Sequence, residues 1–104
     1  MIRISVMYPV EAGNKFDTDY YLQKHMPMVR SRLSAKGMVK AEIDKGLAGA
    51  TPGSPAPFAV IAHLYFKSVN EFQAAFGAHA GEIMGDIPNY TDVQPQIQIS
   101  EILE

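Results

Sequence analysis

Residues 58–67 are apolar at nearly every position, and this stretch constrains the fold more than any other part of the chain. A run of this length rich in β-branched and aromatic side chains is typical of a strand. Val60 and Leu64 lie on one side of such a strand, and Ile61 and Tyr65 lie on the other. An antiparallel sheet covered on one face alternates apolar with polar residues, so this strand is expected to be covered on both. The simplest cover for the second face is another copy of the chain, which predicts a homodimer.

Patterns along the rest of the chain complete a β-α-β-β-α-β order. Apolar side chains alternate in the first strand and recur at helical spacing in the helices. Pro9 and Gly13 mark a loop after the first strand. This is the ferredoxin-like split βαβ order, which predicts a single α+β domain over residues 1–104 with a four-stranded antiparallel sheet and both helices on one face. The predicted elements are strands at 2–8, 39–47, 58–67 and 93–103, a helix from about 18 to 35, and a helix that opens at 68–71.

Capping and breaking residues bound the two helices. Asp17 is a suitable N-cap for the first helix, and Gly37 is a natural stop after it. A capping box begins at Ser68 and opens the second helix. Pro27 predicts a kink or break just before it in the first helix, and Gly77 favours a break in the second.

Composition excludes several classes of protein. The formal net charge is −2, with both signs scattered along the chain, whereas a nucleic-acid-binding protein needs a basic stripe. No apolar run approaches the ~18–20 residues of a membrane span, and the first residues lack the features of a signal peptide. The absence of cysteine excludes disulfides and thiolate chemistry and fits a cytoplasmic protein.

Three histidines lie on or beside apolar faces and supply most of the chemistry available near neutral pH. His25 lies about 60° from the centre of the apolar stripe of the first helix, one turn after Tyr21. It is a candidate pocket histidine that acts as an acid, a base or an orienting group. A backbone carbonyl freed by Pro27 is the expected partner for one of its ring nitrogens. The alternative is a structural histidine that only makes a hydrogen bond.

The placement of the other two histidines depends on features that the sequence leaves open. His63 shares a strand face with Tyr65, and that face lies against either the helices or a partner sheet. His79 is central in the apolar stripe of the second helix if that helix continues through Gly77, and exposed if it breaks. The wide spacing of the three imidazoles does not match metal-site patterns, so no metal or other cofactor is expected.

A polar turn precedes the last strand. Turn chemistry accounts for Asp86, Asn89 and Asp92. It does not account for Tyr90, which is predicted to cap a pocket or to pack against a partner chain.

Several segments together resemble the EthD family, which belongs to the dimeric α/β-barrel superfamily. The resemblance covers nearly the whole chain and is carried by SVMYP, FDTDYYLQKHMPMV, GLAGATPGSPAPF, AHLYFKSVNEFQAAFG and IPNYTDVQPQIQIS. It implies a ferredoxin-like monomer whose sheet pairs with that of a second copy to form a dimeric α/β barrel. It also implies that the histidine of the YY-HMP segment, His25, is the one that acts in a pocket between helices and sheet.

Three functions follow as alternatives. The first is a small cofactor-independent enzyme that isomerises, cyclises or oxidises an apolar or aromatic organic compound. His25 would be its acid–base, Tyr21 and Tyr65 would orient the ring or stabilise an oxyanion, His63 and His79 would be further catalytic candidates, and Met26, Tyr65 and Tyr90 would contact the substrate. The second is a haem-binding protein with one histidine as the axial ligand. The third is a non-catalytic dimer that binds a hydrophobic compound or supports an oxygenase.

Overall fold

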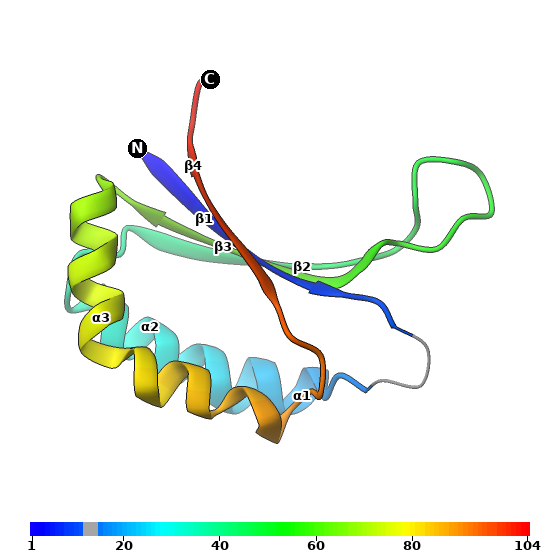
Figure 1. The fold of residues 1–104 in the computed structure, drawn as a ribbon, viewed down its shortest axis with the longest axis horizontal. Coiled ribbons are helices and arrows are strands. Elements are labelled where there is room, and N and C mark those ends of the chain that lie inside the picture. Colours follow the sequence, from blue (N-terminus) through cyan, green and yellow to red (C-terminus); the bar gives the residue numbers. More distant parts are fainter. Residues whose placement is uncertain (12–14) are drawn as a thin grey trace.

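The computed structural model describes residues 1–11 and 15–104 as a sheet with helices packed on one of its faces (Figure 1). Gly13, predicted to mark a loop, lies outside the described residues. The elements are β1 (Ile2–Pro9), α1 (Thr18–Tyr20), a π-helical turn η1 (Tyr21–His25), α2 (Met26–Ser34), β2 (Lys40–Lys45), β3 (Phe58–Phe66), α3 (Val69–Gly85), a 3-10 turn η2 (Ile87–Asn89) and β4 (Gln96–Glu101).

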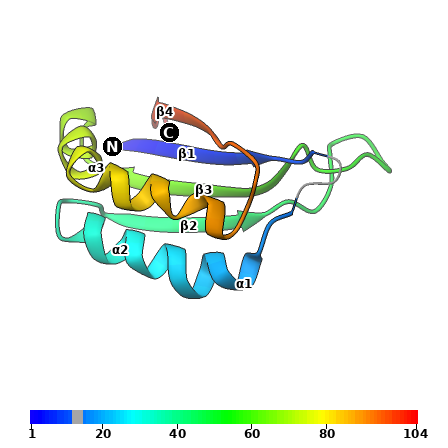
Figure 2. The same ribbon diagram turned by 60° about the horizontal axis from the view of Figure 1, so that its bottom comes forward.

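The sheet has the order β2-β3-β1-β4 and is antiparallel throughout. Ile4 of β1 is in register with Leu64 of β3 and with Ile99 of β4. Figure 2 shows α2 and α3 side by side across the covered face, with β4 at the sheet edge away from α2. The predicted ferredoxin-like α+β fold is therefore confirmed. The helices leave β4 less covered, since Ile97 and Ile99 are 46% and 41% exposed.

The two faces of β3 have different surroundings. Val60 and Leu64 are buried beneath the helices. On the outer face Tyr65 is also buried, because the side chains of Arg3 and Lys40 lie over its ring at 5.3 Å and 4.8 Å from the ring centre. Part of the apolar outer face is thus covered by charged side chains of neighbouring strands, an arrangement that the alternation pattern of β3 alone does not reveal.

A π-helical turn replaces the kink predicted before Pro27. The backbone N–H of Met26 donates to the carbonyl of Tyr21, five residues earlier. The extra residue in this turn shifts the helix phase, so Tyr21 and His25 are buried. Leu22, which α-helical spacing places on the apolar stripe, is 47% exposed.

The second helix is continuous, so the break favoured by Gly77 does not occur. The hydroxyl of Ser68 accepts from the backbone N–H of Glu71 at 3.1 Å, as the capping box predicts. Buried packing by Phe72 and Ala75 outweighs the cost of about 1 kcal/mol that one helical glycine carries. Within the described ranges 1–11 and 15–104, no helix has the length and apolar character needed to cross a membrane.

Candidate functional site

The site centres on His25, the last residue of the π-helical turn. Its side chain is buried, and the residue is only 3% exposed. Ring nitrogen Nδ1 lies 2.9 Å from Oδ2 of Asp86, which caps the C-terminus of α3. The predicted partner, a backbone carbonyl freed by Pro27, is therefore wrong: the π-helical turn carries the ring toward α3, and a carboxylate takes that place.

Asp86 is held by three donors. Its Oδ1 accepts from the hydroxyl of Tyr20 at 2.7 Å and from Nδ2 of Asn89 at 2.9 Å, and its Oδ2 faces His25. Burial raises the pKa of the Asp86 carboxyl, but the hydrogen bonds from Asn89, Tyr20 and His25 outweigh burial and hold that pKa below its usual value. Asp86 is therefore an ionised acceptor that fixes a proton on Nδ1 of His25. Turn chemistry alone did not anticipate this role.

Aromatic side chains enclose the other parts of the imidazole. Tyr21 stacks on it, with ring centres 5.4 Å apart and planes at 18°. The hydroxyl of Tyr90 lies 3.4 Å from Nε2. Burial lowers the pKa of His25, and Asp86 offsets burial only in part. The ring is therefore neutral at pH 7, with the lone pair of Nε2 available to accept a proton.

A second phenol extends this group. The hydroxyls of Tyr8 and Tyr90 are 2.6 Å apart, and both side chains are buried. Burial raises the pKa of each phenol, so both are protonated at pH 7. Tyr90 is wholly buried within its own chain, so the alternative that it packs against a partner chain is not met.

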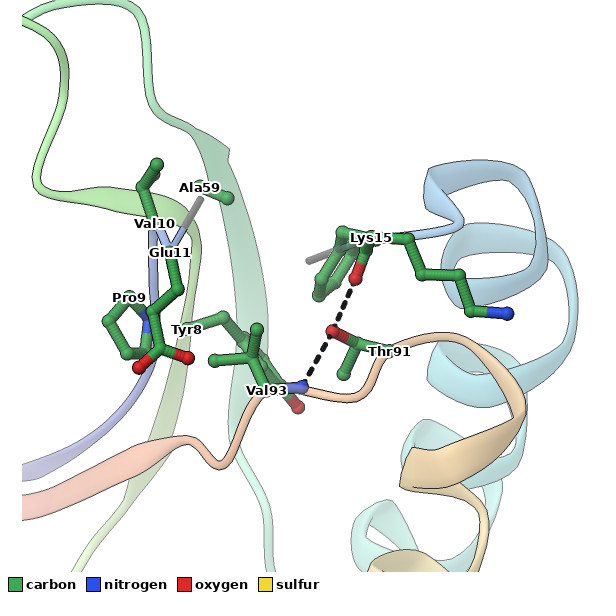
Figure 3. A pocket seen from close by; sticks show the side chains of 9 residues that line it. Tyr8, Pro9, Val10, Glu11, Lys15, Ala59, Thr91 and Val93 are labelled. Carbon is green, nitrogen blue, oxygen red and sulfur yellow. Dashed lines mark hydrogen bonds between the residues drawn. The ribbon is translucent and has the colours of Figure 1, made fainter. Parts of the chain in front are cut away.

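Hydrogen bonds join the segment that carries Tyr90 to the residues that precede α1. The hydroxyl of Thr91 donates to the carbonyl of Lys15 at 2.6 Å and accepts from the backbone N–H of Val93 at 3.2 Å (Figure 3). The backbone N–H of Asp17 donates to the carbonyl of Tyr90 at 2.7 Å. A surface cavity of about 70 Å³ is lined in part by Lys15, Thr91 and Val93. The hydrogen bonds hold Tyr90 in place beside His25.

A second cavity lies between the sheet and the helices, beside His25. It measures about 40 Å³, and its polar side chains are those of Tyr8, Tyr21 and His25. The rest of its wall is apolar and includes Met26, which was predicted to contact substrate. The lining also includes three apolar residues at the edge of the sheet and on α3, Ile83, Met84 and Ile97.

The structure separates the other predicted site residues from this cavity. His63 and Tyr65 lie on the outer face of the sheet, where Nε2 of His63 is 2.8 Å from Oδ2 of Asp44. His79 is half-buried on α3 and does not line the cavity. In the part of the chain that the structure describes, no three metal-ligating side chains gather in one place. The roles predicted for His63, His79 and Tyr65 stay predictions of the sequence and are not part of the function proposed below.

Comparison with known proteins assigns the family. The sequence model of the EthD domain matches residues 13–94. The chain belongs to the EthD family. An EthD-like protein from Ralstonia eutropha JMP134 is 43% identical, with a TM-score of 0.92 over 99% of this chain and 92% of that one. No curated protein sequence matches the chain.

More distant structures share the fold of this EthD-family chain. An ethyl tert-butyl ether (EthD) family protein from Bacillus halodurans C-125 is 16% identical, with a TM-score of 0.68 over 99% of both chains. A dimeric ferredoxin-like protein from an uncultured marine organism is 12% identical, with a TM-score of 0.62 over 100% of this chain and 96% of that one.

Proposed function

We propose that this EthD-family protein is a small enzyme that moves protons on an apolar or aromatic organic compound, with His25 as its acid–base. The observation that carries the proposal is a buried imidazole whose Nδ1 is fixed by an ionised carboxylate at the wall of an otherwise apolar cavity. A perturbed titratable pair in such a cavity is a general mark of a functional site.

The pair of His25 and Asp86 suits general acid–base chemistry. Asp86 holds the tautomer with a lone pair on Nε2, and its negative charge stabilises the imidazolium that forms when Nε2 takes a proton. Asp86 acts through His25 and is therefore a positioning residue. Isomerisation, cyclisation and quinone-forming oxidation all begin with removal of a proton, so the same pair serves each of the predicted reactions.

The cavity favours a compact substrate. Its volume of about 40 Å³ holds only a few waters, so an organic compound must displace side chains to enter. Met84 and Ile97, which line it, are 38% and 46% exposed. Methionine is flexible, and moving these two residues enlarges the cavity without disturbing the buried core.

The two alternative functions have less support. A haem group needs far more space than the cavity beside His25, and both ring nitrogens of that histidine already have partners. His63 pairs with Asp44 on the outer face. A non-catalytic carrier would leave its histidines exposed or bonded to backbone, whereas His25 is bonded to a carboxylate at the cavity wall.

Proton exchange tests the proposal. We expect the protein in D₂O to accelerate exchange of the α-protons of 1-indanone, 1-tetralone or 2-cyclohexenone about 100-fold over buffer, as measured by ¹H NMR. Burial places the pKa of His25 below 6.5, so the rate should hold as pH falls to 6.5 and decline only at lower pH, as the imidazole becomes protonated. The variant His79→Gln is the control and should exchange like the wild type. Rates equal to buffer for all three ketones would contradict the proposal.

The proposed assembly is a homodimer formed through the outer face of the sheet. Met7 and Ile61 are register partners on that face, and none of the described helices covers it (Figure 1). Nδ1 of His63 is also buried there without a hydrogen-bond partner. We expect sedimentation velocity to give a dimer for the wild type and a monomer for Ile61→Arg. The control Leu47→Arg, in an exposed loop, should stay dimeric, and a monomeric wild type would refute the assembly.

The predicted location in the cytoplasm rests on the absence of cysteine and stays a prediction.

A further inference from the structure

We infer that Tyr90 and Tyr8 relay protons between His25 and the cavity, and that the ligand is a phenol or enol whose hydroxyl contacts Tyr8. The inference rests on the proposed role of His25 and names the class of compound that this site takes. It comes from the geometry of one continuous chain of polar atoms, which runs from Asp86 through His25 and Tyr90 to Tyr8.

The direction of each hydrogen bond in this chain follows from its charged end. Asp86 is ionised and only accepts, so Nδ1 of His25 donates to it. Nε2 of the neutral ring then has no proton and accepts from the hydroxyl of Tyr90. Because the proton of Tyr90 is used in this way, its oxygen accepts from Tyr8 at 2.6 Å. The oxygen of Tyr8 is the last atom of the chain and accepts from any further donor.

The chain ends at the cavity. Tyr8 lines it, whereas Tyr90 is wholly buried and does not. The phenol of Tyr21 is also in the wall. A phenol oxygen has two lone pairs, so the oxygen of Tyr8 can accept from a ligand while its own proton goes to Tyr90. The polar groups of the wall gather beside one another, since the ring centres of Tyr8 and Tyr21 are 5.9 Å apart and those of Tyr21 and His25 are 5.4 Å apart.

This distribution of polar groups fits a ligand with one hydroxyl on an apolar body. When such a ligand is bound, the proton of its O–H bond moves to the oxygen of Tyr8, and the electron pair of that bond stays on the ligand oxygen. The proton of Tyr8 moves to Tyr90, and that of Tyr90 moves to Nε2 of His25. The products are a phenolate or enolate and an imidazolium paired with Asp86. The reverse sequence returns the proton, so no other reactant is needed.

The first test measures His25 in the ligand-free protein. Asp86, Tyr90 and Tyr21 are the titratable groups that face its ring among the described residues. A donor to Nε2 stabilises the neutral ring, so Tyr90→Phe should raise the pKa of His25, followed by ¹⁵N NMR of labelled histidine. Tyr8→Phe should raise it less, and Tyr65→Phe, on the outer face, should leave it unchanged. An unchanged or lowered pKa in Tyr90→Phe would overturn the relay.

The second test measures binding without turnover. Phenol should bind the wild type about tenfold more tightly than toluene, which has nearly the same shape but no hydroxyl. Tyr8→Phe should remove this preference, and Tyr65→Phe should keep it. Equal affinities in the wild type, absence of phenol binding, or an intact preference in Tyr8→Phe would overturn the assignment. Neither test uses the ketone exchange assay, so failure of the proposed function and failure of the relay are distinguishable.

Discussion

Replacement of His25 by glutamine should slow ketone proton exchange about 100- to 10,000-fold, the usual contribution of a general acid–base. Glutamine keeps a polar side chain in the buried position, but its amide does not take up or release a proton near pH 7. The rate should be measured by ¹H NMR in D₂O under conditions where circular dichroism shows the variant to be folded. The remaining rate should no longer depend on pH between 4 and 8, because the titrating imidazole is gone.

The variant Asp86→Asn tests whether the tautomer and orientation of His25 matter in addition to the presence of its imidazole. Asparagine can offer its amide N–H₂ to Nδ1, which favours the tautomer with its proton on Nε2 and removes the lone pair that accepts from Tyr90. We therefore expect a loss nearly as large as that of His25→Gln, with His25 still present. Exchange at the wild-type rate in His25→Gln would remove His25 from the mechanism, and the same result in Asp86→Asn would remove the positioning role of Asp86. His79→Gln should match the wild type.

Truncation of Phe66 should lower the free energy of unfolding by about 3–5 kcal/mol. Phe66 is 0% exposed at the end of β3, where it pairs with Ile2 and contacts Phe72 of α3 edge-to-face at 5.4 Å. Phe66→Ala leaves a cavity between the sheet and the second helix that neighbouring side chains fill only in part. Urea denaturation, with the same slope for both proteins, should give the difference directly.

A matched phenylalanine at the other end of β3 provides the control. Phe58 is half-buried, so Phe58→Ala removes less apolar contact and should cost distinctly less than Phe66→Ala. Equal losses for the two variants would show that the end of β3 beside Phe72 is not the better-packed one.

Side-chain periodicity was sufficient to predict the sheet and its topology. Alternation in β1 placed Ile4 and Tyr8 on the helix side, where both are buried. The order of elements then determined the antiparallel sheet, because each predicted helix links strands that are not neighbours. Strand ends were less well predicted: β4 begins at Gln96 rather than Val93, since side-chain alternation continues beyond the hydrogen-bonded ladder.

The candidate site was only partly predictable. His25, Tyr21 and Tyr90 were singled out from the sequence, and the structure brings all three together. Asp86 was missed, because its polar turn context explains an aspartate without any partner and the contact with His25 spans 61 residues of chain. A useful signal was available: a buried histidine needs an acceptor, and Asp86 lies at the end of the only other predicted helix.

The outer face of the sheet shows why His63 and Tyr65 were harder to assign. Period-two alternation says which residues of β3 share a face, but not which face meets the helices. His63 pairs with Ser5 of β1, and Tyr65 pairs with Arg3. Both side chains therefore lie on the face of the sheet away from the cavity. Tyr65 donates instead to Glu42 at 2.8 Å, a cross-strand contact that depends on the register of β2.

Because of the π-helical turn, the side chains that face the cavity near His25 depend on the number of residues in this turn as well as on their identity. Deleting one residue between Asp17 and Tyr21 would leave the turn intact, whereas deleting one inside Tyr21–His25 would restore α-helical spacing and rotate the upstream residues by about 100° relative to Met26. Relatives with the same fold but a uniform first helix would then present a different side chain to the cavity. Insertion or deletion at this one turn would thus change which side chain faces the cavity without any change in the sheet.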